Sequence, residues 1–153
     1  MLLISSSDGK ILLVAADMIG YQAYAAPQAA FVNRYTDPTL TLFTKDVASL
    51  YVPEIQQVET SACCSGKSLL LHFFLFFLLS FLLVSHPHHS LDHQSFYERG
   101  YPSVGLVEGG GYTIDPKYHN VGDTVNRTGY STLQMQGVTR ILIAAGAHIA
   151  ELN

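Results

Sequence analysis

The sequence predicts an α/β sandwich with a mostly parallel sheet. Apolar runs typical of strands alternate with segments whose apolar residues recur at helical spacing, which is the pattern of α/β folds. Residues 11–19 are nearly all apolar between Gly9 and Gly20, as expected of a parallel strand covered on both faces. The chain has 153 residues, 48 % of them apolar, so it can form one domain with a sizeable core.

Four segments are predicted to be strands. The first is residues 11–19, which is too short for a typical buried helix. The others, in chain order, are residues 29–35, 55–58 and 102–107. Gly109 to Gly111 then open a loop that leads to His119.

Three segments are predicted to be helices. Asp37 and Pro38 give an N-cap and a proline at the first helical position, and this helix should end before Pro53. Residues 92–99 form a short helix closed by Gly100, and Ser131 caps a last helix. The expected apolar face of the first helix is Leu40, Phe43, Val47 and Leu50. That of the last is Leu133, Gln136–Gly137, Ile141, Ala144–Ala145 and His148, extended by Ile149 and Leu152.

Asp17 and His119 are the candidate metal ligands. Sites in such sheets form at the carboxyl ends of strands, where Asp17 and the loop of His119 should lie. Zinc accepts both carboxylate oxygen and imidazole nitrogen. Asp123-Thr124 is placed to support the loop, and a metal-bound histidine needs a partner that orients its ring. Two alternatives stay open. Asp17 can cap the next turn or accept N–H bonds at Gly20-Tyr21, and His119 can be a loop histidine bonded to a backbone carbonyl.

Residues 67–90 interrupt this pattern and divide the domain into residues 1–66 and 91–153. Within them, residues 69–84 form an apolar run broken only by His72 and Ser80. The run is short of the roughly 20 residues of a membrane helix, and as a core element it would leave too much apolar surface. The favoured hypothesis is a translated intron, because pyrimidine-rich codons encode this composition. A membrane segment is the alternative.

Two other groups of residues contain metal-binding or acid–base side chains, but we favour a non-functional interpretation of each. His86, His88, His89, Asp92 and His93 crowd together like a metal-binding tract, but the favoured interpretation is an accident of the insertion and its exit. The glutamates have no spacing that marks a general base, and each is expected to be a surface or loop carboxylate: Glu54, Glu59, Glu98, Glu108 and Glu151.

The charge and the cysteine content limit the partners and the disulfides that we expect for this chain. The formal net charge is −4, and no run of lysine or arginine indicates a nucleic-acid partner. Cys63 and Cys64 are adjacent, so they are too close to bridge each other readily. Asn126 begins a glycosylation sequon, which matters if the chain is secreted. The first residues do not have the pattern of a signal peptide.

Four motifs, taken together, carry a family resemblance: Asp17-Met-Ile-Gly-Tyr21, Asp92-His-Gln-Ser-Phe96, Gly100-Tyr-Pro-Ser103 and Tyr118-His-Asn-Val-Gly-Asp-Thr124. In this order they resemble the zinc aminopeptidases of the bacterial leucyl aminopeptidase type, a metallopeptidase family with secreted bacterial and fungal members. The resemblance covers residues 10–65 and 91–153. It implies a phosphorylase/hydrolase-like fold, which is a three-layer α/β/α sandwich.

The resemblance also implies a site with two zinc ions that share a water. Asp17 matches one ligand and His119 another, each on a different ion. The family's first histidine, bridging aspartate, general-base glutamate and ligand glutamate stand upstream of the matched region. We therefore expect a C-terminal part of the domain, inactive alone, whose full-length product is secreted and cleaves peptide or protein N-termini. Met18 and Tyr118 match positions that can line the substrate pocket, with core packing as the alternative.

The resemblance also bears on one disulfide and on two alternative functions. Cys63 matches the first cysteine of a family disulfide, but the apolar run stands where the second should be. A membrane-anchored, non-catalytic ectodomain of the same fold is the alternative function. Glutaminyl cyclisation or carboxypeptidase action on the same scaffold is a third option.

Overall fold

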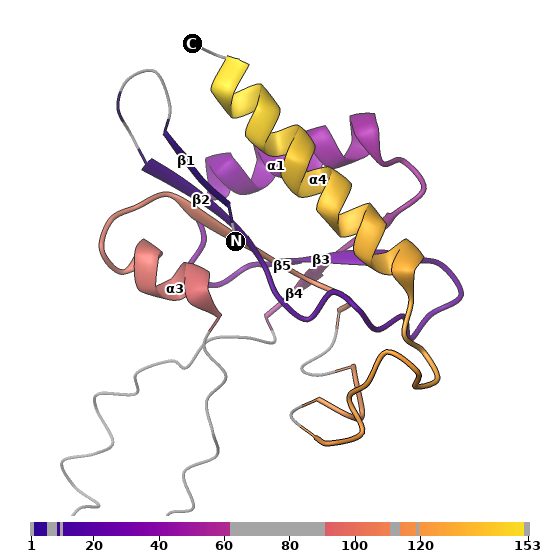
Figure 1. Ribbon diagram of the computed structural model, residues 1–153. Helices are drawn as coiled ribbons and strands as arrows, with labels where there is room; N and C mark the ends of the chain where they lie inside the picture. Colours follow the sequence, from indigo (N-terminus) through magenta and orange to yellow (C-terminus); the bar gives the residue numbers. More distant parts are fainter. Residues whose placement is uncertain are drawn as a thin grey trace, which may run out of the picture.

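A computed structural model describes residues 2–5, 9, 11–61, 91–110, 114–118 and 120–151 of the chain. Strands and helices alternate along it, so the predicted mixed α/β class is confirmed (Figure 1). In chain order the elements are β1 (Leu2–Ser5), β2 (Ile11–Ala16), β3 (Gln28–Val32), α1 (Pro38–Tyr51), β4 (Gln56–Thr60), α3 (Asp92–Tyr97), β5 (Ser103–Val107) and α4 (Thr132–Glu151).

The five strands form one sheet in the order β1-β2-β5-β3-β4. The pairs β2–β5 and β3–β4 are parallel, as the sequence predicts, whereas β1–β2 and β3–β5 are antiparallel. Because β3 runs opposite to β5, the carboxyl ends of β2 and β5 lie together at one edge of the sheet, meaning an edge formed by the ends of the strands. The carboxyl ends of β3 and β4 lie at the opposite edge.

Helices lie on both faces of the sheet (Figure 1). α1 and α4 cover one face, and the larger core lies beneath them, with Val14, Phe31, Leu40, Leu106, Val138 and Ile141 among its buried side chains. A smaller cluster on the other face contains Ala30, Val32, Leu91 and Val107, next to the start of α3. A complete second helical layer, as in the expected three-layer sandwich, stays a prediction.

Three strands, β2, β3 and β5, are shorter than predicted, β4 ends two residues later than predicted, and one strand was not predicted. β2 ends at Ala16, because Met18 adopts a φ of 50° and turns the chain. β3 ends at Val32, and Tyr35 turns the chain with a φ of 52°. The strand that the sequence did not reveal is β1, which pairs antiparallel with β2 from Leu2 to Ser5. A four-residue strand at the start of a chain has too few residues for a periodic signal.

The buried faces of the helices differ from the predicted ones at their ends. Leu50 is 69 % exposed and Leu133 is 66 % exposed, and Gln136 is also exposed. At about 100° per residue, Ala48 and Leu50 lie about 80° from Leu40 on opposite sides of it around the helix axis, so the face centred between Leu40 and Ala48 excludes Leu50. The side chains that α1 buries instead are Leu40, Thr44, Val47 and Ala48, and α4 buries Gln134, Val138, Ile141, Ala145 and Ile149.

The predicted helix ends are confirmed. Asp37 Oδ1 accepts a hydrogen bond from the backbone N–H of Leu40 at 2.7 Å, and Pro38 is the first helical residue. Ser131 Oγ accepts from the N–H of Gln134 at 3.2 Å. Gly100 follows α3 with a φ of 84°, a conformation that glycine adopts without strain.

The cap at Asp37 gives a first testable prediction. Replacing an N-cap aspartate with alanine leaves helix N–H groups without their partner, so Asp37→Ala should lower the free energy of unfolding by about 1 kcal/mol. Urea denaturation followed by circular dichroism measures this. Asp46→Ala, at an exposed position inside the same helix, is the control. Equal losses in both variants would contradict a capping role for Asp37.

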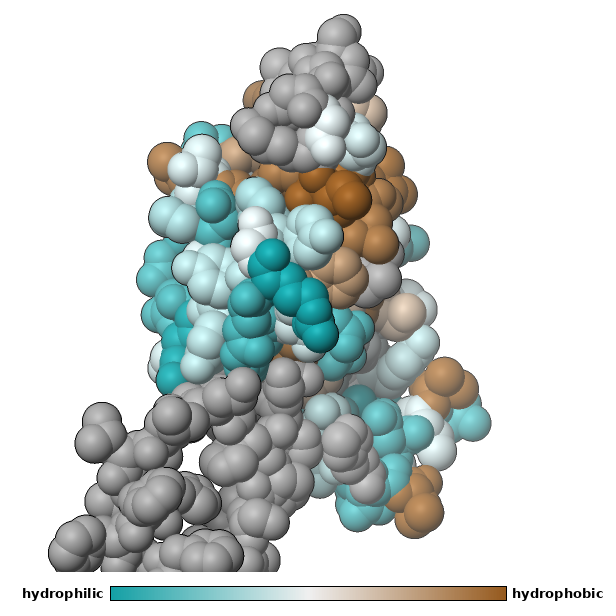
Figure 2. Space-filling view, turned by 90° about the vertical axis from the view of Figure 1, so that its left-hand side faces the viewer, coloured by the Kyte–Doolittle hydropathy of each residue, from teal (hydrophilic) through white to brown (hydrophobic). Residues whose placement is uncertain are grey.

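Two observations concern the predicted membrane segment. The apolar insertion of residues 67–90 lies outside the described residues. Among the helices that the structure describes, none combines the length and the apolar character that a membrane span requires. The side of the molecule in Figure 2 carries both polar and apolar surface. Leu3 and Ile11 belong to β1 and β2, the outermost pair of strands on one side of the sheet, and they are 48 % and 44 % exposed.

Candidate active-site edge

The candidate site lies where β2 and β5 end side by side. The backbone pairing of these parallel strands continues past their last residues: the N–H of Asp17 donates to the carbonyl of Leu106 at 3.1 Å. The N–H of Glu108 donates to the carbonyl of Met18 at 3.0 Å. Two carboxylates, Asp17 and Glu108, therefore follow neighbouring strands at the same edge of the sheet, as expected for a site in an α/β fold.

Asp17 is exposed at this edge. The strand ends one residue earlier, at Ala16, and the turn at Met18 leaves the carboxylate in solvent. Asp17 Oδ1 accepts a hydrogen bond from the N–H of Met18 at 2.8 Å. A carboxylate offers about four lone-pair directions, so one such bond leaves it able to bind a metal ion. The donor chemistry therefore suits zinc.

Glu108 is a site residue that the sequence analysis missed. It is 5 % exposed rather than a surface carboxylate. Its Oε2 accepts a hydrogen bond from the backbone N–H of Tyr21 at 2.6 Å. Glu108, and not Asp17, therefore receives the N–H of Tyr21.

Burial raises the pKa of Glu108 to about 7, because an ionised carboxylate is poorly solvated inside the protein. The hydrogen bond from the Tyr21 N–H acts in the opposite direction and lowers this pKa, the negative charge of Asp115 raises it, and Arg127 lowers it. The group therefore changes its charge near neutral pH. A sequence signal existed, because residues 102–107 form an apolar strand that ends in one carboxylate, as residues 11–16 do.

Arg127 joins two acidic residues of the loop between β5 and α4. Its guanidinium donates to both carboxylate oxygens of Asp115, with an Nη2–Oδ2 distance of 2.6 Å. Its Nε lies 3.1 Å from Oδ1 of Asp123. The side chains of Arg127 and Asp115 are 9 % and 6 % exposed, so this ion pair is largely shielded from water. Asp123, expected to support His119, is thus engaged by Arg127.

The remaining predicted site residues have these positions. Met18 is half-buried and packs against the cluster of Ala30, Val32, Leu91 and Val107, and Tyr118 is half-buried in the loop that follows β5. Asn126 is exposed. His119 and Cys63 lie outside the described residues. The roles predicted for these residues, and the pairing of Asp17 with His119, stay predictions.

His93 is a core residue. It is fully buried, and its Nε2 lies 3.1 Å from the carbonyl oxygen of Arg34. Burial lowers its pKa, because the charged imidazolium is disfavoured there. Gly105 leaves the space for the ring, since a Cβ at that position would lie 2.6 Å from its Nδ1. His86, His88 and His89 of the suspected tract lie outside the described residues. Among the described side chains, no three His, Cys, Asp or Glu residues are grouped to hold a metal ion.

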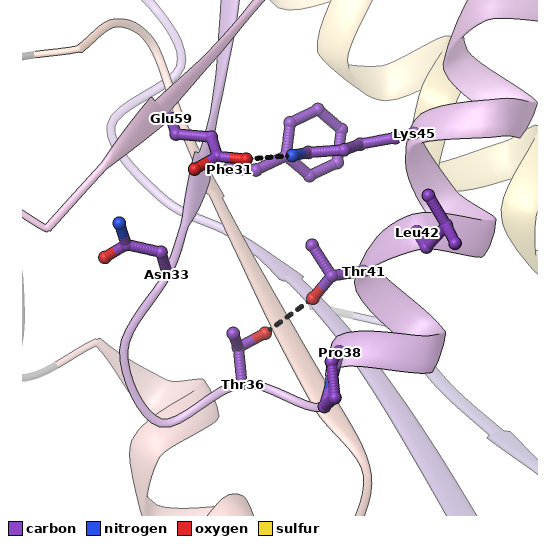
Figure 3. Close-up of a pocket in the computed structure, with 8 residues that line it drawn as sticks. All are labelled: Phe31, Asn33, Thr36, Pro38, Thr41, Leu42, Lys45 and Glu59. Atoms are coloured by element: carbon purple, nitrogen blue, oxygen red, sulfur yellow. Dashed lines mark hydrogen bonds and ion pairs between the residues drawn. The ribbon is translucent and has the colours of Figure 1, made fainter.

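A hollow of about 430 Å³ lies at the opposite edge of the sheet, between α1 and the ends of β3 and β4 (Figure 3). Lys45 crosses it over the ring of Phe31 and meets Oε1 of Glu59 at 2.5 Å. The hydroxyls of Thr36 and Thr41 bond each other at 2.9 Å. These polar groups already have partners within the protein, so we do not assign the hollow as the functional site.

Comparison with known proteins gives the fold but no family. No protein-family model matches the sequence, and no curated protein matches it. Solved structures do match. One structure of the LapA aminopeptidase of Legionella pneumophila superimposes with a TM-score of 0.63 at 16 % identity, over 90 % of this chain and 30 % of LapA. A second LapA structure gives 0.67 at 17 % identity, over 90 % and 32 %.

LapB of Legionella pneumophila superimposes with a TM-score of 0.65 at 19 % identity, over 92 % of this chain and 32 % of LapB. These identities are too low to carry more than the architecture. This chain therefore has an aminopeptidase-like fold, similar to that of LapA and LapB, and spans about a third of their length.

Proposed function

We propose that this chain is part of a zinc-dependent aminopeptidase, which removes N-terminal residues from peptides with a water activated between two zinc ions. One observation carries the proposal: Asp17, which matches a zinc ligand of this family, is exposed at the carboxyl end of β2. It lies beside the end of β5 in a fold similar to that of LapA aminopeptidase. The loop that contains His119 leaves from β5 at this same edge.

Asp17 and His119 would each hold one zinc ion, through a carboxylate oxygen and an imidazole nitrogen. When bound, zinc lowers the pKa of its water and polarises a carbonyl group. The bond from the Met18 N–H to Oδ1 fixes how the Asp17 carboxylate is turned. Met18 and Tyr118 would contact the N-terminal side chain of the substrate. In the full-length secreted product, Asn126 would be glycosylated and Cys63 would take part in a disulfide.

The 153-residue chain alone should not hydrolyse peptides. Of the family's ligands and general base, Asp17 and His119 are the two that its motifs match, and LapA and LapB are about three times as long. We expect no hydrolysis of leucyl-p-nitroanilide with added zinc beyond that of a His119→Ala control. Zinc-dependent turnover that the control lacks would show that the chain is active by itself.

The aminopeptidase assignment itself is tested at the gene. Reading the genomic DNA upstream of the Met1 codon should reveal an in-frame His-x-Asp and a Glu-Glu pair, which supply the remaining ligands and the base. A product that includes this region should hydrolyse leucyl-p-nitroanilide with zinc, and Asp17→Asn should remove that activity. An upstream region without these codons would contradict the assignment. Sequencing the transcript decides whether residues 67–90 are a translated intron.

A membrane-anchored, non-catalytic ectodomain of the same fold is the second candidate. The apolar run of residues 69–84 favours it, and the match of Asp17 and His119 to zinc ligands favours the enzyme. The two candidates differ in whether the expressed protein needs detergent. An anchored protein should require detergent to remain in solution after expression, whereas the enzyme part should not.

A further inference from the structure

Two loops meet at the candidate edge, and their bases are joined by backbone pairing. The first loop follows β2, and the second connects β5 to α4 (Figure 1). The N–H of Gln22 donates to the carbonyl of Gly129 at 2.9 Å. The N–H of Ser131 donates to the carbonyl of Gly20, also at 2.9 Å. Residues 20–22 and 129–131 are therefore held together independently of any side chain.

The described residues 115–118 and 120–124 of the second loop are organised differently. Their backbone hydrogen bonds are local turns, such as the N–H of Tyr118 to the carbonyl of Asp115 and the N–H of Asp123 to the carbonyl of Asn120. Val121, in this part of the loop, is 99 % exposed. Local turns shape a loop but do not fix it against the rest of the protein. Its position must come from longer-range contacts.

Arg127 supplies such contacts from one side chain. Its guanidinium donates to both oxygens of Asp115, which gives this two-pronged pair a defined geometry. The same guanidinium lies over the ring of Tyr21, with its central carbon 4.9 Å from the ring centre. Arg127 therefore contacts the outer part of the second loop and a residue of the first.

Tyr21 is a fixed support for this contact. Its N–H is held by the carboxylate of Glu108 at the end of β5. Its ring packs against Gly129, where a Cβ would lie 2.2 Å from Cε2 of the ring. Gly129 also has a φ of 88°, a conformation that favours glycine. The ring of Tyr21 thus contacts both Arg127 and the base of the second loop.

We propose that Arg127 is a positioning residue that holds residues 115–118 and 120–123, which flank the predicted ligand His119 in the sequence, against the loop that follows the predicted ligand Asp17. This assignment rests on the proposed function for the meaning of the two ligands, but not for the contact itself. A site whose loops are already placed needs less ordering when zinc binds. The ion pair of Arg127 with Asp115 is the element that places them.

Pulsed-EPR distances between spin labels test the proposal in the whole chain, with Cys63 and Cys64 replaced by serine and a chelator present. Labels at Ala25→Cys and Val121→Cys report on the two loops, and labels at Ala25→Cys and Leu50→Cys report on the fold. All three positions are exposed. Arg127→Met should widen the first distance distribution by about two-fold or more and leave the second unchanged. Arg140→Met, which removes an exposed pair with Glu54, should change neither.

An unchanged distribution between the loops in Arg127→Met would overturn the proposal. So would equal widening of both distributions, because Arg127 would then stabilise the whole fold rather than place the loop. If circular dichroism shows that Arg127→Met does not fold, the same two distance distributions are measured in Arg127→Lys. Lysine keeps the charge but loses the planar fork, so the same outcomes are expected. The measurement contains no metal and no substrate. A failed peptidase assignment would therefore leave its result intact.

Discussion

Replacing Glu108 with glutamine should remove a large pH dependence of stability. Burial raises the pKa of Glu108 from 4.5 to about 7 in the folded protein. Between these values the folded state keeps a proton that the unfolded chain releases, so the free energy of unfolding falls as the pH rises. Below this window both states are protonated, and above it both are ionised. The total loss is about 3 kcal/mol.

Glutamine at position 108 cannot ionise, but its amide oxygen can still accept the N–H of Tyr21. The unfolding free energy of Glu108→Gln relative to the parent should therefore rise by about 3 kcal/mol between about pH 4 and pH 8. Urea denaturation at a series of pH values measures this difference. His93, whose lowered pKa removes stability as the pH falls below its ordinary value, acts equally in both proteins and cancels.

Glu98→Gln is the matched control for this experiment, because Glu98 is exposed at the end of α3. Its stability should follow the parent across the pH range. If Glu108→Gln also follows the parent, Glu108 is not a buried carboxylate with a raised pKa. The hydrogen bond that it accepts from Tyr21 would then not be a buried one.

Replacing Gln134 with methionine should cost about 2–4 kcal/mol of unfolding free energy, because it leaves two buried backbone groups without partners. Gln134 is fully buried in the first turn of α4. Its side-chain oxygen accepts the backbone N–H of Gln28 at 2.8 Å, and its side-chain nitrogen donates to the carbonyl of the same residue. This one amide therefore satisfies the first residue of β3 and joins it to α4.

Methionine has a similar length but can make neither bond. Denaturation with urea gives the change in unfolding free energy. Gln136→Met, two residues later on the exposed side of the same helix, is the control and should be within about 0.5 kcal/mol of the parent. A loss below about 1 kcal/mol in Gln134→Met would mean that water or a shifted backbone satisfies Gln28 instead.

Much of the local structure could be predicted because its signals lie within a few residues. Asp37 and Pro38 begin α1, Ser131 caps α4, and Gly100 closes α3, each through a bond or a backbone angle that a short segment decides. The run of residues 11–16 indicated a buried strand by its composition alone. Asp17 was placed at the carboxyl edge of the sheet on the same basis.

The environment of each side chain at that edge was decided by the tertiary structure. Glu108 is buried and accepts a hydrogen bond from the N–H of Tyr21, which stands 87 positions earlier in the chain. The pairing of Asp115 with Arg127 depends on a loop with no periodic pattern. Asp17 is exposed because the chain turns at Met18, where a non-glycine residue takes a positive φ that no propensity favours.

The sequence by itself therefore determined the strands and helices other than β1, where the helices begin, and that a carboxylate follows the first long strand. Caps, prolines and apolar periods depend on residues that are close together in the sequence, so they can be recognised before the fold is known. Only the tertiary structure decided which carboxylate is buried, which is exposed and which loops meet. Burial and pairing depend on residues brought together from distant parts of the chain, and these set the energy of a charge.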